Sequence, residues 1–174
     1  MRRTLPTLGA CCLLVLLGSQ PADAAGPGQT PPSPPRAQAA SPAAAAAVRT
    51  LERAGVFALG GVGFAGTTSE TEKALRAVLA RKDGPAALRS LLRGRTTVEG
   101  RLYALLGLRW ADPAAYRKAV GEFRARKGTV RTMRGCVQSD RPVAEVVREI
   151  EKGEYDGFKD APVRDLPSGS GSAA

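Results

Sequence analysis

The stretch Thr96–Trp110 (TTVEGRLYALLGLRW) decides the fold, because it is the most apolar segment of helical spacing beyond residue 24. Its opening, Thr96-Thr97-Val98-Glu99, has the Ser/Thr-x-x-Glu spacing of a capping box, so a helix is expected to begin there. The apolar side chains that follow cover more than one stripe: Val98, Leu102, Tyr103, Leu105, Leu106, Leu108 and Trp110. A surface helix needs only one stripe, so this segment is predicted to be a central, largely buried helix.

Shorter amphipathic segments with helix start and stop signals lie on both sides of the central helix. They predict helices over Pro42–Ala54, from the Ser69 capping box to Leu79, over Ala87–Leu92, from Asp112-Pro113 to Phe123, and from Pro142 to Ile150. The predicted fold class is therefore all-α, as a small bundle or a short helical-repeat-like stack of five to six helices. Only Val56–Leu59 and Thr129–Met133 have the composition of strands, and they could add one short β ribbon.

The central segment also carries a family resemblance. Gly100–Leu108 (GRLYALLGL), followed by a helix that opens on proline, resembles the inner helix of HEAT-type repeats. The wider pattern over residues 56–155, with TSETEKAL, MRGCV and EKGEY, is similar to uncharacterised exported bacterial proteins. The resemblance implies a helical stack in an exported protein, and it implies no activity and no site residues.

The first 24 residues are predicted to be a secretory signal peptide that is removed. Arg2 and Arg3 precede the apolar run Leu13–Leu17, and Ala22-Asp23-Ala24 offers small residues for cleavage near Ala24/Ala25. That run is shorter than the roughly 20 residues that span a bilayer, so no transmembrane segment is expected after cleavage. We therefore expect a secreted or periplasmic protein. A lipoprotein attached through Cys11 is the weaker alternative, because the apolar run follows this cysteine.

Composition divides the remaining chain into three parts. Residues 25–41 are rich in Pro, Ala and Ser and are predicted to be a disordered linker. Residues 42–160 are predicted to be the helical domain. Residues 161–174 end in PSGSGSAA and are predicted to be a disordered tail.

Positive charge is concentrated in the middle of the chain. The formal net charge is +10, and Lys73–Arg134 holds 16 Lys or Arg against 4 Asp or Glu. The residues of a candidate basic ridge are Arg117, Arg124, Arg126, Lys127, Arg131 and Arg134. Such a ridge could bind a partner protein or an anionic envelope component, or it could be a solvated surface. Nucleic acid is not expected as a partner, because few aromatic side chains are available for base stacking.

Gly61–Gly66 (GVGFAG) matches the G-x-G-x-x-G pattern of a dinucleotide-binding loop. The acidic ribose ligand should stand about 20 residues further on, where Arg81 and Lys82 are found. No cofactor is therefore expected, and the pattern is interpreted as a glycine turn before a capped helix. The residues Gly66, Thr67, Thr68 and Ser69 remain a candidate anion site at that helix N-terminus.

Catalytic chemistry has little support in the sequence. The chain contains no histidine, which excludes Ser-His-Asp and Cys-His catalysis and makes a zinc site improbable. Cys136 is the one cysteine left after signal cleavage, as a buried apolar residue, a link to another chain or a reactive thiol. We therefore expect no enzyme and no metal, and an exported non-catalytic domain that binds a partner protein or an anionic envelope surface. The alternative is a small thiol-dependent or redox-responsive protein that uses Cys136.

Overall fold

The computed structural model describes residues 41–165. The predicted signal peptide, nearly all of the predicted linker and the end of the predicted tail lie outside this range. The elements are α1 (Pro42–Glu52), β1 (Phe57–Val62), β2 (Thr67–Thr68), α2 (Glu70–Leu79), α3 (Gly84–Arg93), α4 (Val98–Ala111), α5 (Pro113–Arg124), β3 (Thr129–Gly135), β4 (Val137–Pro142), α6 (Val143–Lys152) and the 3₁₀ turn η1 (Asp156–Phe158). None of the helices in residues 41–165 combines the length and apolar character needed to cross a membrane.

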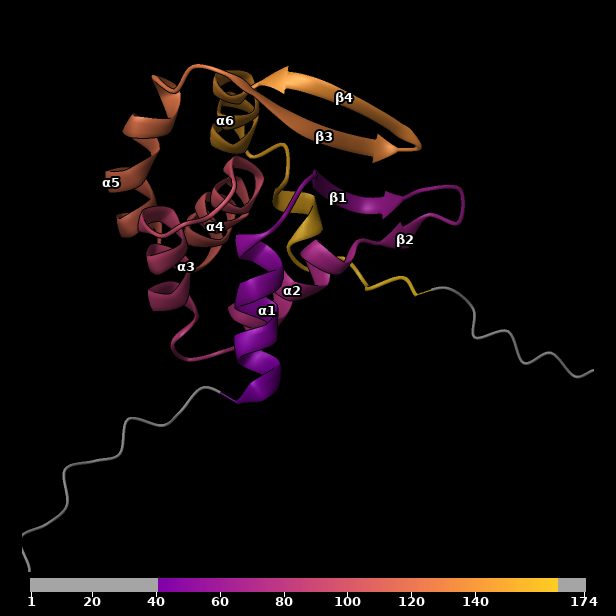
Figure 1. Ribbon diagram of the computed structural model, residues 1–174, viewed down its shortest axis with the longest axis horizontal. Helices are drawn as coiled ribbons and strands as arrows, with labels where there is room; N and C mark the ends of the chain where they lie inside the picture. The colour runs from indigo at the N-terminus through magenta and orange to yellow at the C-terminus, as the bar shows by residue number, and fades with distance from the viewer. Residues whose placement is uncertain (1–40, 166–174) are drawn as a thin grey trace, which may run out of the picture. The chain divides into compact units, whose positions relative to one another are not determined.

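A four-stranded mixed sheet accompanies the helices, so the all-α prediction is wrong. The strand order is β2-β1-β3-β4, in which β1 and β3 are parallel and both outer pairs are antiparallel (Figure 1). The two segments expected as a ribbon do pair, but as parallel neighbours joined through the helices α2 to α5. β4 was not predicted because its sequence, VQSDRP, is largely exposed and lacks apolar alternation. The mixed sheet also differs from the helical stack that the resemblance implies.

The prediction of a central buried helix is confirmed. Every residue of α4 from Leu102 to Leu108 is buried. α4 begins one residue later than the capping box predicts: Thr97, and not Thr96, is the N-cap, and its hydroxyl accepts a hydrogen bond of 3.1 Å from the Gly100 N–H. Two glycines let neighbouring helices approach α4 closely. A Cβ on Gly100 would lie 2.0 Å from the Leu51 carbonyl oxygen of α1, and a Cβ on Gly107 would lie 2.8 Å from Leu88 of α3.

The buried Tyr103 joins α4 to the sheet. Its hydroxyl accepts a hydrogen bond of 2.8 Å from the Ala58 N–H and donates one of 2.6 Å to the Ala58 carbonyl. These two backbone groups lie on the edge of β1 that faces away from β3. On this edge β2 pairs only with Gly61 and Val62, so no strand lies opposite Ala58. The tyrosine therefore replaces the missing strand at this point. Burial raises the pKa of Tyr103 to about 12, so the hydroxyl stays a donor even at alkaline pH.

The buried Glu72 of α2 serves the same edge two residues further along. Its Oε2 accepts a hydrogen bond of 2.7 Å from the Gly60 N–H, and its Oε1 lies 2.6 Å from Nη2 of Arg76. Arg76 then donates to the carbonyls of Phe158 and Ala161, at 2.7 and 2.5 Å. The segment after α6 is thereby held against α2 and β1.

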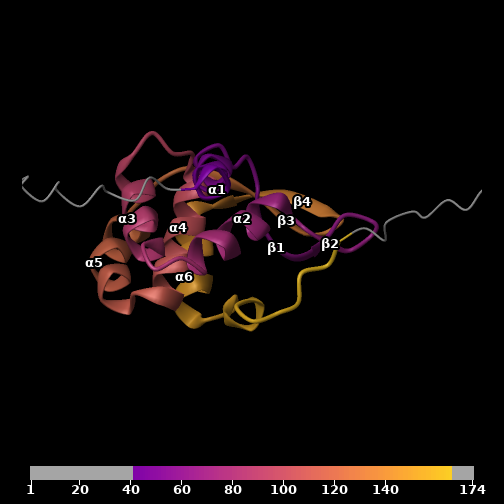
Figure 2. The same ribbon diagram turned by 90° about the horizontal axis from the view of Figure 1, so that it is seen from below.

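The helices and the hairpins occupy opposite ends of the described unit. Figures 1 and 2 both show α3 and α5 at one end and the β1–β2 and β3–β4 hairpins at the other. The helices cover the inner face of the sheet, where Phe57, Val130 and Thr132 are buried. The hairpin ends project beyond the helices.

Replacing Tyr103 by Phe tests the role of the hydroxyl. We expect Tyr103→Phe to lower the free energy of unfolding by about 1–3 kcal/mol, because the buried Ala58 N–H loses its partner and the Ala58 carbonyl keeps only the longer bond of 3.4 Å from the Ser69 hydroxyl. Tyr116→Phe is the matched control, since the Tyr116 hydroxyl is also buried but has no hydrogen-bond partner among the described residues. Urea unfolding of both variants gives the comparison, and equal losses of stability would contradict the assignment.

Candidate functional site

The six residues of the predicted basic ridge lie on α5, on the turn that follows it and on β3. Three of them are neutralised by carboxylates of neighbouring elements. Arg124 pairs with Glu151 of α6, Arg131 lies 3.8 Å from Asp140 of β4, and Arg134 lies 3.1 Å from Glu149 of α6. These three arginines therefore connect elements of the fold, in addition to any role at the surface.

The other three residues of the ridge, Arg117, Arg126 and Lys127, have no ion pair among residues 41–165. The same holds for the exposed Lys118 of α5 and Arg93 of α3. Arg126 lies over the ring of Phe123, with 5.7 Å between the guanidinium carbon and the ring centre. We call these five residues (Arg93, Arg117, Lys118, Arg126 and Lys127) the basic face.

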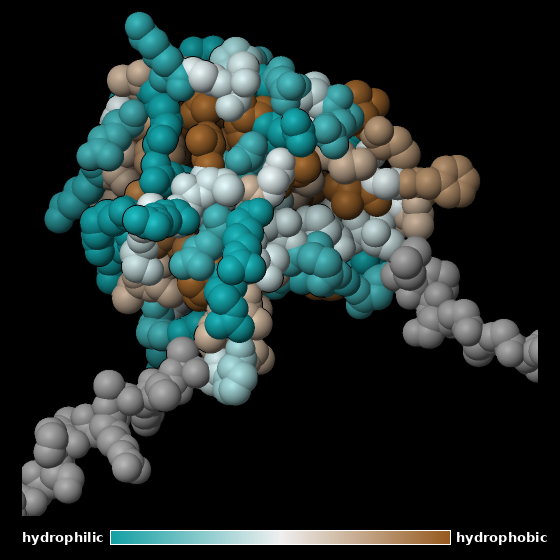
Figure 3. Space-filling model, viewed as in Figure 1, coloured by the Kyte–Doolittle hydropathy of each residue, from teal (hydrophilic) through white to brown (hydrophobic). Residues whose placement is uncertain are grey.

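A groove of about 260 Å³ runs between α3 and α5. Both helices pack on α4, and the buried Leu108 of α4 forms part of the floor. The other lining residues are Arg89, Leu92, Arg93, Ala115, Lys118, Ala119, Glu122 and Phe123. The groove therefore has an apolar floor and mainly basic walls. Over α3 and α5, Figure 3 shows hydrophilic side chains with hydrophobic surface between them.

Asp112 fixes the relative position of the two walls of the groove. As the N-cap of α5, its Oδ1 accepts a hydrogen bond of 3.0 Å from the Ala115 N–H. Its Oδ2 accepts one of 2.5 Å from Arg89 of α3. The Asp112 carboxylate thus caps α5 and also bonds α5 to α3. Arg93 and Lys118, which line the same groove, have no carboxylate partner among the described residues. Arg89 and Arg93 were not predicted as part of a binding surface, although they stand four residues apart on one helix face.

The G-x-G-x-x-G stretch forms the tip of the β1–β2 hairpin. Gly63 and Gly66 have positive φ angles of 71° and 59°, and Phe64 between them is fully exposed. The expected glycine turn before a capped helix is confirmed, since the Ser69 hydroxyl caps α2 by accepting from the Glu72 N–H.

The candidate anion site at Gly66, Thr67, Thr68 and Ser69 has much of its hydrogen-bonding capacity used within the chain. The Gly66 N–H donates to the Gly63 carbonyl at 3.1 Å, and the Thr68 N–H donates to the Arg164 carbonyl at 2.7 Å. Thr67 and Thr68 belong to β2, which pairs with β1. The backbone donors of Gly66 and Thr68 are therefore not free for an anion.

Cys136 is exposed at the tip of the β3–β4 hairpin. This position excludes the buried apolar role, and it leaves the reactive thiol and the link to another chain as hypotheses. Within the described residues, no group of three His, Cys, Asp or Glu side chains is arranged to hold a metal ion.

A partly buried polar network centred on Glu149 joins α6, β3 and β4. Its two oxygens accept hydrogen bonds from Arg141 at 2.9 and 2.5 Å, from Tyr155 at 2.6 Å and from Arg134 at 3.1 Å. Partial burial raises the pKa of Glu149, but the hydrogen bonds from Arg141 and Tyr155 outweigh it, so the pKa lies below its usual 4.5. Burial and the hydrogen bond to Glu149 raise the pKa of Tyr155 to about 12.

Comparisons with protein families, with curated proteins and with solved structures found no match to this chain.

The lowered pKa of Glu149 predicts a contribution to acid stability. Because the pKa is depressed in the folded state, this contribution is present above the unfolded value near 4.5 and is lost as the pH falls below it. We expect Glu149→Gln to reduce the loss of stability between about pH 6 and pH 3. Glu151→Gln is the control, because Glu151 pairs with the exposed Arg124. Thermal unfolding over this pH range measures both, and an unchanged pH profile in Glu149→Gln would count against the network.

Proposed function

We propose that this chain is an exported, non-catalytic domain that binds an anionic partner through the basic face and the adjoining α3–α5 groove. The observation that carries the proposal is the division of the predicted ridge into paired and unpaired cations. Arg117, Arg126 and Lys127 keep their charge without a carboxylate partner among the described residues, whereas Arg124, Arg131 and Arg134 are paired. Unpaired surface cations attract an anionic partner without first losing an intramolecular ion pair.

The groove favours an acidic segment of a partner protein over a purely polar polymer. Its floor, which includes Leu92, Leu108 and Phe123, offers apolar surface between basic walls. An amphipathic helix with apolar residues at i, i+3 or i+4 and flanking carboxylates has the complementary pattern. An anionic envelope surface would contact Arg117, Arg126 and Lys127 but would leave this floor unused.

Support for a non-catalytic role comes from the placement of the perturbed ionisable groups. Glu149, Asp83 and Asp156 have lowered pKa values and each lies against an arginine that connects parts of the fold. Tyr103 and Tyr155 have raised pKa values because they are buried. These shifts have structural causes, and the chain has no histidine to act as a general base at neutral pH.

One observation favours the alternative function. The thiol of Cys136 is exposed at a hairpin tip, where a reagent or a second cysteine can reach it. Among residues 41–165, no hydrogen bond to this thiol is present. We therefore propose the binding domain first and the thiol-dependent protein second.

Two triple variants of equal charge separate binding by the basic face from binding by net charge. Arg117→Gln/Arg126→Gln/Lys127→Gln removes unpaired cations, and Lys73→Gln/Arg81→Gln/Arg131→Gln removes paired ones. At about 1 kcal/mol for each basic residue near an anionic surface, we expect the first variant to bind at least tenfold more weakly. The control should change much less.

Binding is measured on heparin, on phosphatidylglycerol vesicles and with a leucine- and glutamate-rich helical peptide. Preference for the peptide supports a protein partner, and preference for vesicles supports the envelope surface. Equal weakening of both triple variants, or no weakening of either, would remove the basic face from the proposal.

The reaction of Cys136 with a thiol reagent tests the alternative function. We expect the folded protein to react at Cys136 without denaturant, at a rate near that of a free cysteine thiol at the same pH. Cys136→Ser provides the background from any other thiol in the chain. A rate more than about tenfold above that of free cysteine would indicate an activated thiol and favour the alternative.

A further inference from the structure

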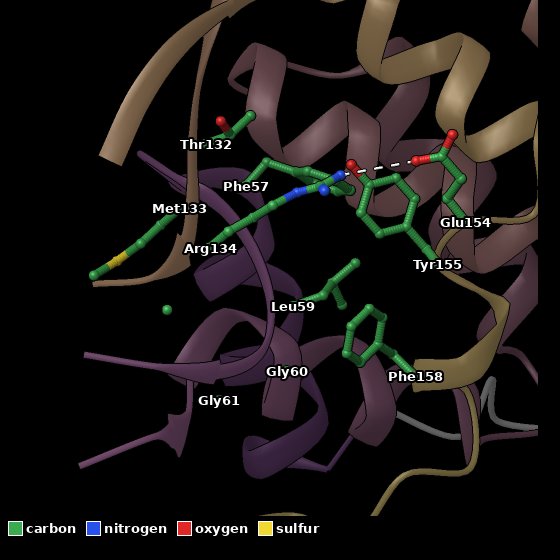
Figure 4. Close-up of a pocket in the computed structure, with 11 residues that line it drawn as sticks. Phe57, Leu59, Gly60, Gly61, Thr132, Met133, Arg134, Glu154, Tyr155 and Phe158 are labelled. Atoms are coloured by element: carbon green, nitrogen blue, oxygen red, sulfur yellow. Dashed lines mark ion pairs between the residues drawn. The ribbon is translucent and has the colours of Figure 1, made fainter. Parts of the chain in front are cut away.

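A pocket of about 330 Å³ lies on the inner face of the sheet, apart from the basic face and the α3–α5 groove. Three segments that are distant in sequence form it: β1, β3 and the chain that follows α6 (Figure 4). Its lining residues are Phe57, Leu59, Gly60, Gly61, Thr132, Met133, Arg134, Gly135, Glu154, Tyr155 and Phe158.

One part of the pocket is apolar. Leu59 and Phe158 lie side by side in Figure 4, and Phe57 completes this part of the wall, whereas the Met133 side chain points away from it. Gly60 has a φ angle of 82°, and a Cβ at this position would lie 2.6 Å from the Phe158 ring. The ring can therefore lie directly on the backbone of β1 because position 60 is glycine. This apolar part has the composition expected for the side chain of a small ligand.

The other part of the pocket carries two opposite charges. Arg134 extends from β3 toward Glu154, and its guanidinium lies beside the Tyr155 hydroxyl in Figure 4. The closest distance between Arg134 Nη2 and Glu154 Oε2 is 3.9 Å, which is beyond hydrogen-bond range. The two charges face each other and leave room for additional partners.

The hydrogen-bonding capacity of both charged groups is only partly used. Arg134 donates through Nη2 to Glu149 at 3.1 Å. Its pKa is raised mainly by an interaction with the Tyr155 hydroxyl. No other hydrogen bond from its side chain is present among the described residues. Glu149 cannot supply more, because Arg141 and Tyr155 already occupy both of its oxygens. Glu154 accepts no hydrogen bond from residues 41–165 and has a side chain that is 42% exposed. The pocket thus presents guanidinium donors and a carboxylate acceptor beside an apolar wall.

From this juxtaposition we propose that the pocket binds a free α-amino acid with an apolar side chain. The α-carboxylate of the ligand accepts hydrogen bonds from Arg134, the α-ammonium donates to Glu154, and the side chain packs against Leu59, Phe57 and Phe158. A simple carboxylate would leave Glu154 partly desolvated without a partner, and a simple amine would do the same to Arg134. The volume is at the lower end of the range for ligand pockets, which suits a molecule of this size.

This site uses neither the basic face nor the groove, so it stands independently of the proposed function. It gives the domain a small-molecule ligand in addition to a macromolecular partner.

Titration calorimetry of the full-length protein with L-leucine and L-phenylalanine tests the proposal. We expect saturable binding, with both Arg134→Gln and Glu154→Gln at least tenfold weaker. Arg131→Gln is the matched control, because Arg131 lies on the opposite face of β3 and should leave the affinity unchanged. Urea unfolding of each variant shows whether the fold is retained.

Two analogues of phenylalanine assign the charged contacts. 3-Phenylpropanoate lacks the ammonium and 2-phenylethylamine lacks the carboxylate, so each should bind at least tenfold more weakly than phenylalanine. The affinity of 2-phenylethylamine should not respond to Arg134→Gln, since the group that contacts Arg134 is missing. No saturable binding of either amino acid, or equal affinities for the amino acid and both analogues, would overturn the proposal.

Discussion

The two hydrogen bonds between Tyr103 and Ala58 are the constraint on which the rest of the structure depends. β1 has a strand partner along one edge, β3, but over most of its other edge it faces the helices. Unpaired backbone groups in such a buried position would be costly, so a side chain must take the place of a strand. Tyr103 does this at Ala58 and Glu72 does it at Gly60. Both side chains come from helices, and the helices and the sheet are therefore one structural unit.

The same device, a charged or polar side chain that connects two elements, recurs at the other junctions. Asp112 caps α5 and pairs with Arg89 of α3. Glu149 accepts hydrogen bonds from Arg134 of β3 and Arg141 of β4. Carboxylates used in this way are not available to neutralise the remaining cations. In a chain of net charge +10, this leaves an unpaired basic face at the helical end. At the sheet end, Arg134 and Glu154 face each other over an apolar pocket.

Local sequence signals predicted the helices, but they did not predict the sheet. The apolar residues on more than one side of α4 and the helix cap at Ser69 are local sequence patterns, and the structure confirms both. β4 has no apolar alternation, and its pairing with β3 depends on the tight turn at Gly135-Cys136. The basic ridge was visible as spacing, but its division into paired and unpaired members depends on carboxylates such as Glu149 and Glu151, which lie on α6. The groove and the pocket were not predictable, because each is formed by segments that only the tertiary fold brings together.

Hydrogen–deuterium exchange at two amides tests most directly whether helices and sheet form one unit. The N–H groups of Ala58 and Gly60 are bonded to side chains of α4 and α2 and to no strand. We expect these two amides to exchange as slowly as the ladder amides of β3, with the same opening free energy as the core amides of α4. Fast exchange at Ala58 and Gly60 while the α4 amides stay protected would show that the sheet opens independently, and it would contradict the account.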